Sequence, residues 1–339
     1  MKIKRTTVKS WLFIGLLFFA LSMEQAFCSP TITRLTENSY PDTQPVLNGN
    51  EIIFLRNYNM ALYNNGTTTD LTSDFPTNQY SNMLKSGDYL AYRQYHEGQF
   101  TTYYSDGTNT TELIPNGDTE KLVDLKGNTL YLWNYQTNAF RKYDGTNFTS
   151  LPNTSYPNEK YGRPSIDMNG DKIVWGNGTL YVYDGTNTTE LTALGICQRP
   201  AINANRIAYV NPFAEASNIM LYDIATDTIS LISTTAPYIV EDVMLYGDII
   251  VWLEKAGTSR YTIKSYDISD GTETLIAENA YLNGYDLDVD KFVFSQNVTG
   301  SSSELFLVDF SDAQPSVPEP ASIILLIMAL GSMARKIFF

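Results

Sequence analysis

Residues 170 to 192 begin Gly170-Asp-Lys-Ile-Val-Trp175 and, after a short link, continue Leu180-Tyr-Val-Tyr-Asp-Gly-Thr-Asn-Thr-Thr-Glu-Leu-Thr192. The first six residues follow a pattern: Gly, then Asp or Asn, any residue, an aliphatic residue or Phe, any residue, and usually an aromatic residue. Seven copies occur at spacings of 34 to 43 residues, and two of them have lost the glycine. The copies begin at Gly49 (GNEIIF), Gly87 (GDYLAY), Gly127 (GNTLYL), Gly170 (GDKIVW), Ala204 (ANRIAY), Gly247 (GDIIVW) and Val289 (VDKFVF). A fixed period of this length indicates a repeat architecture.

Each copy has the pattern of about four short strands joined by tight turns. The alternating residues 180–183 lead into Asp-Gly, which favours a two-residue hairpin turn because both positions tolerate positive φ. No segment between the two ends of the chain shows sustained helical periodicity. Four strands in about 40 residues are typical of one propeller blade. The sequence therefore predicts an all-β, seven-bladed β-propeller.

The aromatic residue that closes the six-residue pattern is predicted to fill the space between blades, because one blade cannot bury its faces alone. These residues are Phe54, Tyr92, Trp175, Tyr209, Trp252 and Phe294. The ring is also predicted to close through its two ends. The last copy stops after Leu305–Phe310 without an outer strand, and Thr31–Thr36 (TITRLT) resembles the missing strand. Closure by residues 31–36 removes two exposed sheet edges, which otherwise invite aggregation.

The repeats resemble the TolB-type propeller family, whose blades pair a Pro-led inner strand with an aliphatic-aromatic strand and end in Leu-Thr. The parallels are Pro45 to Phe54, Pro164 to Trp175 with Leu191-Thr192, and Pro200 to Tyr209. The resemblance spans residues 31 to 310, and the turn here is Asn-Gly-Asn or Asn-Gly-Asp. It implies a noncatalytic interaction scaffold, although fold-level analogy says little about function.

The N-terminus has the organisation of an export signal. Four basic residues within the first nine positions precede the apolar run 11–21, and Ala26-Phe27-Cys28 supplies small residues for a signal-peptidase site. Lipidation of Cys28 is the alternative, but Gln25 stands where a lipobox has an aliphatic residue. Cleavage after Cys28 leaves Cys197 as the one remaining cysteine, so no intramolecular disulfide is expected.

The C-terminus resembles the PEP-CTERM sorting signal, which an exosortase-type membrane protease handles in bacteria that secrete exopolysaccharide. The signal residues are Pro318, Glu319 and Pro320, followed by an apolar run and then Arg335 and Lys336. The apolar residues 321–334 reach about 21 Å as a helix, short of a hydrocarbon core of about 30 Å, so a temporary transmembrane anchor is expected. Positive charge beyond the span predicts that this end stays in the cytoplasm.

These features divide the chain into a signal peptide (1–28), a propeller (29–312), a linker (313–317) and a sorting and anchor segment (318–339). The expected location is a membrane-anchored precursor, followed by the cell surface or the extracellular space.

The composition is acidic. The chain has 23 Lys and Arg against 37 Asp and Glu, and removal of residues 1–28 and of the residues after Pro320 leaves 17 against 36, a net charge of about −19. Such a surface repels nucleic acid, so nucleic-acid binding is excluded. Acidity also favours solubility of an exported protein.

The sequence offers no catalytic residue that stands out. His96, the one histidine, lies in a predicted hairpin turn, and no Gly-x-Ser-x-Gly elbow accompanies it. The best candidate for calcium is 286–290 (DLDVD), echoed by 167–171 (DMNGD), yet both occupy the turn between the first two strands, where Asp and Asn are expected anyway. We therefore predict no catalytic, metal or cofactor-binding residues and no cofactor.

Two hypotheses from different classes remain. The first is an exported noncatalytic propeller that binds exopolysaccharide or a surface protein, for which the 24 tyrosines offer stacking surfaces. The second is an extracellular carbohydrate-active enzyme with a pair of acidic residues at the propeller channel.

Overall fold

The computed structural model describes residues 30–311 apart from 75–76, 115–118, 153, 155–164, 192–193, 213–215, 236–237, 256–259, 281 and 300–301. The predicted signal peptide, linker and sorting segment lie outside the described residues. No helix in the described part of the chain is long and apolar enough to cross a membrane.

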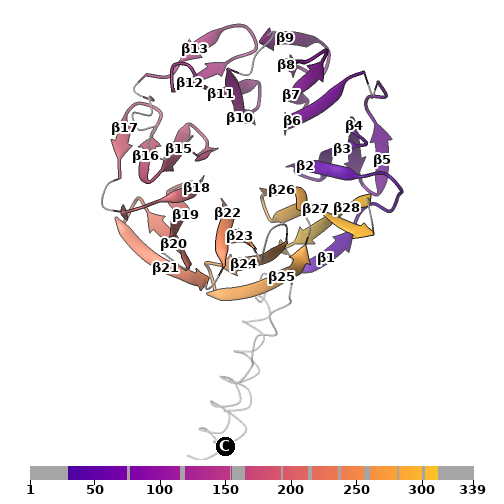
Figure 1. Cartoon of the computed structure of the whole chain (residues 1–339). Helices are drawn as coiled ribbons and strands as arrows, with labels where there is room; N and C mark the ends of the chain where they lie inside the picture. Colours follow the sequence, from indigo (N-terminus) through magenta and orange to yellow (C-terminus); the bar gives the residue numbers. More distant parts are fainter. Residues whose placement is uncertain are drawn as a thin grey trace, which may run out of the picture. The chain divides into compact units, whose positions relative to one another are not determined.

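The described strands form seven antiparallel sheets of four strands each, arranged as blades in a ring (Figure 1). The inner strands are β2 (Asp42–Asn48), β6 (Gln79–Ser86), β10 (Glu120–Lys126), β14 (Ser165–Asn169), β18 (Gln198–Asn203), β22 (Ile239–Tyr246) and β26 (Leu282–Asp288). The second strands are β3 (Glu51–Arg56), β7 (Tyr89–His96), β11 (Thr129–Asn134), β15 (Lys172–Asn177), β19 (Arg206–Pro212), β23 (Ile249–Lys255) and β27 (Lys291–Thr299).

The other half of each blade completes the ring outward. The third strands are β4 (Asn59–Asn64), β8 (Gln99–Ser105), β12 (Ala139–Tyr143), β16 (Thr179–Tyr183), β20 (Ser217–Asp223), β24 (Tyr261–Asp267) and β28 (Ser302–Asp309). The outer strands are β5 (Thr67–Asp70), β9 (Thr110–Ile114), β13 (Phe148–Ser150), β17 (Thr188–Glu190), β21 (Thr228–Thr235), β25 (Thr272–Ala280) and β1 (Thr31–Arg34). The prediction of an all-β, seven-bladed propeller is confirmed.

The six-residue pattern begins in a tight turn and continues into the second strand of the blade. In blade 1, Asn48 pairs with Glu51, so Gly49 and Asn50 form a two-residue hairpin turn, and Gly49 has φ 64°. Where the glycine is lost, Ala204 and Val289 keep a positive φ of 53° and 54°. The turn geometry is therefore retained in all seven blades, at a local cost of about 1–2 kcal/mol for a residue that carries a Cβ.

The prediction of a two-residue turn at Asp-Gly is wrong. In blade 4, Tyr183 pairs with Thr188, which leaves a four-residue turn from Asp184 to Asn187. Oδ1 of Asp184 accepts hydrogen bonds from the backbone N–H groups of residues 186 and 187, at 2.8 and 2.7 Å. Because these two backbone N–H groups bond to the Asp184 side chain, they favour a four-residue turn over a two-residue turn. The same N–H donors lower the pKa of the Asp184 carboxyl.

The second strands hold the blades together through alternating side chains. Trp175 packs with Trp133 and Phe140 of the preceding blade, whereas its neighbour Val174 packs with Tyr209 of the following blade. This alternation follows from the two-residue period of a strand. Aromatic residues predicted to pack between blades do so at Phe54, Tyr92, Trp175, Tyr209 and Trp252. Phe294 is equally buried and stacks on Phe306 of its own blade.

The closing strand lies where the sequence predicts it. The sheet of blade 7 has the order β1-β28-β27-β26, so the first described strand supplies its outer position (Figure 1). Beyond β1, Leu35 N–H donates to the Leu305 carbonyl at 2.8 Å, and Leu305 N–H donates to Thr36 Oγ1 at 3.0 Å. The ring is therefore closed by residues near both ends of the propeller.

The antiparallel blades give the propeller two different faces. Turns that join inner to second strands and third to outer strands lie on one face, which we name the turn face. Hairpins between second and third strands, together with the links between blades, lie on the other, which we name the loop face. Each inner-to-second turn places one Asn or Asp on the turn face, at Asn50, Asp88, Asn128, Asp171, Asn205, Asp248 and Asp290.

Candidate functional site

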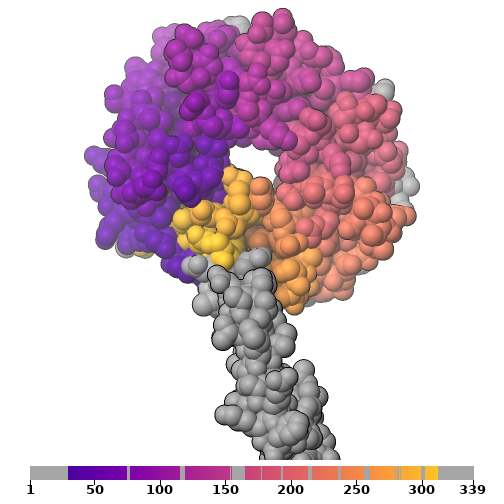
Figure 2. Space-filling model, turned by 180° about the vertical axis from the view of Figure 1, so that it is seen from behind, coloured from indigo at the N-terminus to yellow at the C-terminus, as the bar shows by residue number. Residues whose placement is uncertain are grey.

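The inner strands surround a channel that is open at its centre (Figure 2). Six of the seven inner strands carry a bulge or irregularity near their loop-face ends, in β2, β6, β10, β18, β22 and β26. A bulge leaves one residue unpaired and changes the direction of its side chain. Three such residues, Gln44, Asn82 and Arg199, have a φ of 49–51°.

Asp124, Asp167, Asp242 and Asp286 lie on four of the inner strands that surround the channel. Three of them join neighbouring blades through one carboxylate oxygen. Asp286 Oδ2 accepts from Leu47 N–H at 2.8 Å, and Asp167 Oδ2 accepts from Ile202 N–H at 2.7 Å. Asp242 Oδ2 accepts from the Tyr285 hydroxyl at 2.8 Å. These carboxylates therefore act as clamps between blades.

Burial raises the pKa of both Asp167 and Asp286 to about 7, although two backbone N–H donors per carboxylate act in the opposite direction. The charge of Asp124 adds to the rise in both cases. Desolvation likewise lowers the pKa of Lys121, on β10, and the neighbouring Arg199 adds to that decrease.

The two acidic stretches considered for calcium, 286–290 and 167–171, form the same kind of hydrogen bond between blades. Besides Asp286, Asp288 Oδ2 accepts from Gly49 N–H at 3.2 Å, and Asn169 Oδ1 accepts from Ala204 N–H at 3.2 Å. Alternate oxygens on one strand face here satisfy backbone donors of the next blade. Within the described residues, no group of three or more His, Cys, Asp or Glu is placed to hold a metal ion.

His96 and Cys197 do not belong to the channel site. His96 ends β7 beside the Glu97-Gly98 turn, is exposed, and contacts the Thr77 carbonyl through Nδ1 at 3.0 Å. Cys197 is fully buried, and burial raises the pKa of its thiol to about 12. The sequence predicted the hairpin position of His96 correctly.

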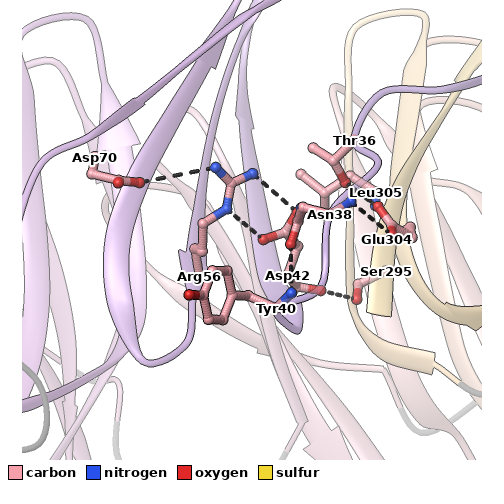
Figure 3. Close-up of polar contacts among 9 residues, drawn as sticks. All are labelled: Thr36, Asn38, Tyr40, Asp42, Arg56, Asp70, Ser295, Glu304 and Leu305. Carbon is pink, nitrogen blue, oxygen red and sulfur yellow. Dashed lines mark hydrogen bonds and ion pairs between the residues drawn. The ribbon is translucent and has the colours of Figure 1, made fainter. Parts of the chain in front are cut away.

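A second candidate site, which the sequence did not reveal, lies on the loop face beside the closing strand (Figure 3). The backbone N–H of Tyr40 donates to Asn38 Oδ1 at 2.8 Å. Asn38 in turn donates from its backbone N–H to Glu304 Oε1 at 3.2 Å, and from Nδ2 to Asp42 Oδ2 at 2.8 Å. Arg56 holds the fully buried Asp42 through Nε and Nη2, at 3.0 and 3.2 Å. The loop that carries Tyr40 is therefore fixed on both sides.

Tyr58 lies on the neighbouring hairpin turn between β3 and β4. The two turns are joined because Asn57 N–H donates to the Pro41 carbonyl at 3.1 Å. Asn57 and Tyr58 have φ of 49° and 64°, and a bulky residue with positive φ is a conformational outlier. We name Tyr40 and Tyr58, whose residues are 54% and 51% exposed, the tyrosine platform. Its side chains face solvent from a backbone fixed by hydrogen bonds.

Exposed aromatic residues are unequally distributed between the two faces. Tyr40, Tyr58, Tyr95 and Tyr238 are all exposed at loop-face positions. Among the described residues, Val289 is the one exposed large hydrophobic residue in the turns of the opposite face. The exposed tyrosines therefore lie on the loop face, whereas Phe148, the first residue of β13, is an exposed aromatic residue beside a turn of the opposite face.

Comparisons with known proteins support the fold alone. No family model matches the sequence, and no curated protein matches it. The fold is similar to an oligogalacturonate lyase in complex with manganese, with 13% identity, a TM-score of 0.58, and coverage of 83% of this chain and 96% of that chain. The propeller domain of the Trilobed protease from Pyrococcus furiosus, described as having an open velcro topology, has 12% identity and a TM-score of 0.59 over 83% and 100% of the two chains. YCF48 from Cyanidioschyzon merolae has 12% identity and a TM-score of 0.55 over 82% and 98%.

Proposed function

We propose that this protein is an exported, noncatalytic scaffold that binds polysaccharide through the loop face of its propeller. The observation that carries the proposal is the tyrosine platform, together with the further exposed tyrosines on the same face. A tyrosine ring presents an apolar surface for the C–H face of a sugar, and its hydroxyl group can hydrogen-bond to sugar hydroxyls.

The fixed loops support binding because little conformational freedom remains to be lost. Asn38 and Asp42 order the backbone around Tyr40 before any ligand arrives, and the turn of Tyr58 is bonded to the same loop. Preorganisation of this kind improves affinity by lowering the entropic cost of association. The acidity of the exported part disfavours polyanions, so neutral polysaccharides are the expected ligands.

The cellular setting follows from the resemblance of the two ends of the chain to sorting signals. In this proposal the signal peptide exports the propeller, and the PEP-CTERM segment anchors it until an exosortase-type protease acts at residues 318–320. The mature scaffold then belongs to the cell surface or the exopolysaccharide matrix, where surface proteins are further possible partners.

The test uses Tyr58→Gly, with Val289→Gly as its matched control. Both replace an exposed residue that has positive φ, but they lie on opposite faces. Tyr58→Gly also creates Asn-Gly, the preferred sequence of a two-residue hairpin turn, so its melting temperature should not fall. Affinity electrophoresis of residues 29 to 317 in gels containing neutral polysaccharides should show binding at least tenfold weaker for Tyr58→Gly, and unchanged for Val289→Gly. Equal retention of the two variants would refute the role of the platform.

One observation favours the second candidate function, a carbohydrate-active enzyme. Asp167 and Asp286 have pKa values of about 7, which suits a general acid. Each of these carboxylates also accepts a backbone N–H from the next blade, which is the reason we prefer a structural role. Release of reducing ends that disappears in Asp167→Asn or Asp286→Asn, with folding retained, would establish the enzyme instead.

A further inference from the structure

The outer strand β21 differs from the other outer strands of the ring. It spans eight residues, Thr228-Ile-Ser-Leu-Ile-Ser-Thr-Thr235, and none of them is charged. Its neighbour β17 has three residues, so β21 extends well beyond it. Edge strands that are short or that carry charged side chains do not normally pair with other chains. Every other described outer strand is either three residues long or carries a charge, at Arg34, Asp70, Glu112, Glu190, Glu273 and Glu278.

Two large apolar side chains of β21 face solvent. The residues Ile229 and Leu231 are 46% and 57% exposed and lie two positions apart, on one face of the strand. They pair with Tyr222 and Met220 of β20, which pack in the core between blades 4 and 5. Exposed apolar side chains thus extend this core to the free edge of the blade.

We propose that β21 pairs with β21 of a second copy of this protein, in an antiparallel arrangement about a two-fold axis at Ser230. This register places Leu231 opposite the partner's Ile229, and Ile229 opposite the partner's Leu231. Apolar pairs directly opposite each other are the unit that stabilises an antiparallel pair of strands. A two-fold axis allows both copies to use the same surface, as in most dimers of identical chains. The two blades then form one continuous sheet of eight strands.

The charge of the molecule favours this strand as the place of contact. Two copies with a large net negative charge repel each other over most of their surfaces. The acidic residues beside β21 are Asp227, in the turn that precedes the strand, and Glu273 of the next blade, whose Oε2 accepts from Ser233 Oγ at 3.0 Å and whose Oε1 lies 3.3 Å from Lys264 Nζ. In the proposed register the two Asp227 residues lie about 20 Å apart, six residues along an antiparallel strand, which is more than twice the Debye length of about 8 Å at physiological salt. The repulsion between the two Asp227 residues is therefore screened, and the charge of Glu273, which lies beside Ser233 opposite the partner's Asp227, is paired with Lys264.

Strand pairing at the rim is also compatible with the proposed binding face. The outer strands lie at the periphery of the ring, away from the inner strands and the channel (Figure 1). Both loop faces of the dimer remain uncovered, although the inference does not depend on what they bind.

Disulfide trapping of the full chain tests the register. Ser230→Cys places a thiol on the two-fold axis, and Thr274→Cys is the matched control in the outer strand β25 of the next blade. The unaltered chain, which keeps its own cysteines, gives the baseline, and its Cys197 is fully buried. Mild oxidation should convert most of Ser230→Cys, and neither control, to a covalent dimer on a non-reducing gel. A Ser230→Cys yield no higher than that of Thr274→Cys would overturn the proposal.

Sedimentation provides a second measurement that does not require a thiol. Leu231→Lys should weaken the dimer at least tenfold, whereas Leu275→Lys, at a similarly exposed position on β25, should not change it. Equal melting temperatures would show that both variants fold. A monomeric unaltered protein at micromolar concentration, or a dimer that Leu231→Lys leaves intact, would contradict the inference.

Discussion

Replacement of Glu304 by Ala should weaken the closure of the ring more than any change of an exposed acidic residue nearby. Glu304 is 1% exposed, and its two oxygens accept from Thr36 Oγ1 at 2.9 Å and from Asn38 N–H at 3.2 Å. Arg34 Nη2 lies 3.2 Å from the same carboxylate. All three partners precede blade 1 in the sequence, so one side chain of β28 contacts three residues of the closing segment, two of which, Thr36 and Asn38, are drawn in Figure 3.

The expected loss is about 3 kcal/mol, because removal of one partner from a buried charged network typically costs about 3–5 kcal/mol and Arg34 keeps partial access to water. For a propeller of this size, that corresponds to a fall of about 5 °C in melting temperature. Urea unfolding followed by tryptophan fluorescence measures the loss. Glu37→Ala is the control, since Glu37 also pairs with Arg34, at 3.8 Å, but is largely exposed. If Glu304→Ala and Glu37→Ala lower the free energy of unfolding by amounts within about 0.5 kcal/mol of each other, the usual limit for surface changes, then Glu304 does not stabilise the closure.

Three further predictions concern the channel, the histidine and the tail. The folded pKa of Asp286, about 7, lies above its unfolded value of about 3.9, so the folded state binds the extra proton between these limits and stability should decrease as pH rises from 4 to 7. Asp286→Asn should flatten this dependence in urea unfolding curves, and an unchanged slope would contradict the assignment. His96→Ala should leave stability and polysaccharide retention within error, since the ring is exposed in a hairpin; a turnover that vanished with it would show that the protein is an enzyme. Changing residues 318–320 together to Ala should trap a membrane-anchored precursor, and mass spectrometry of a surface form of the unaltered protein that still ends at Phe339 would argue against sorting.

The fold was predictable because its determinants are periodic and local. The pattern that begins at Gly49 and recurs to Val289 marks a turn and a buried strand in each blade, and side chains alternate between the two neighbouring blades. Closure was predictable because the last repeat has no outer strand after Leu305–Phe310 and Thr31–Thr36 resembles the missing strand. The length of the Asp-Gly turn was predicted wrongly. The Asp184 side chain accepts two backbone N–H groups, and turn propensities alone do not include this side-chain bonding.

The candidate sites were harder to predict because they depend on contacts between distant residues. Asp286 of blade 7 accepts from Leu47 N–H of blade 1, and these two residues become neighbours only when the ring is closed. The tyrosine platform depends on Asn57 reaching Pro41 and on Tyr58 having positive φ, and neither has a signal in the sequence. Tyrosine is common in strands, and its abundance does not indicate which copies are exposed.

One pair of assays on the same incubations tests the central claim, that the propeller binds polysaccharide without altering it. Purified residues 29 to 317 are mixed with each member of a panel of neutral and acidic polysaccharides, and both retention and release of reducing ends are recorded. We expect at least one neutral polysaccharide to retain the protein, Tyr58→Gly to weaken this retention, and no reducing ends to appear above the level of the polymer alone. Release of reducing ends that increases with protein concentration, or no retention by any polymer, would contradict it.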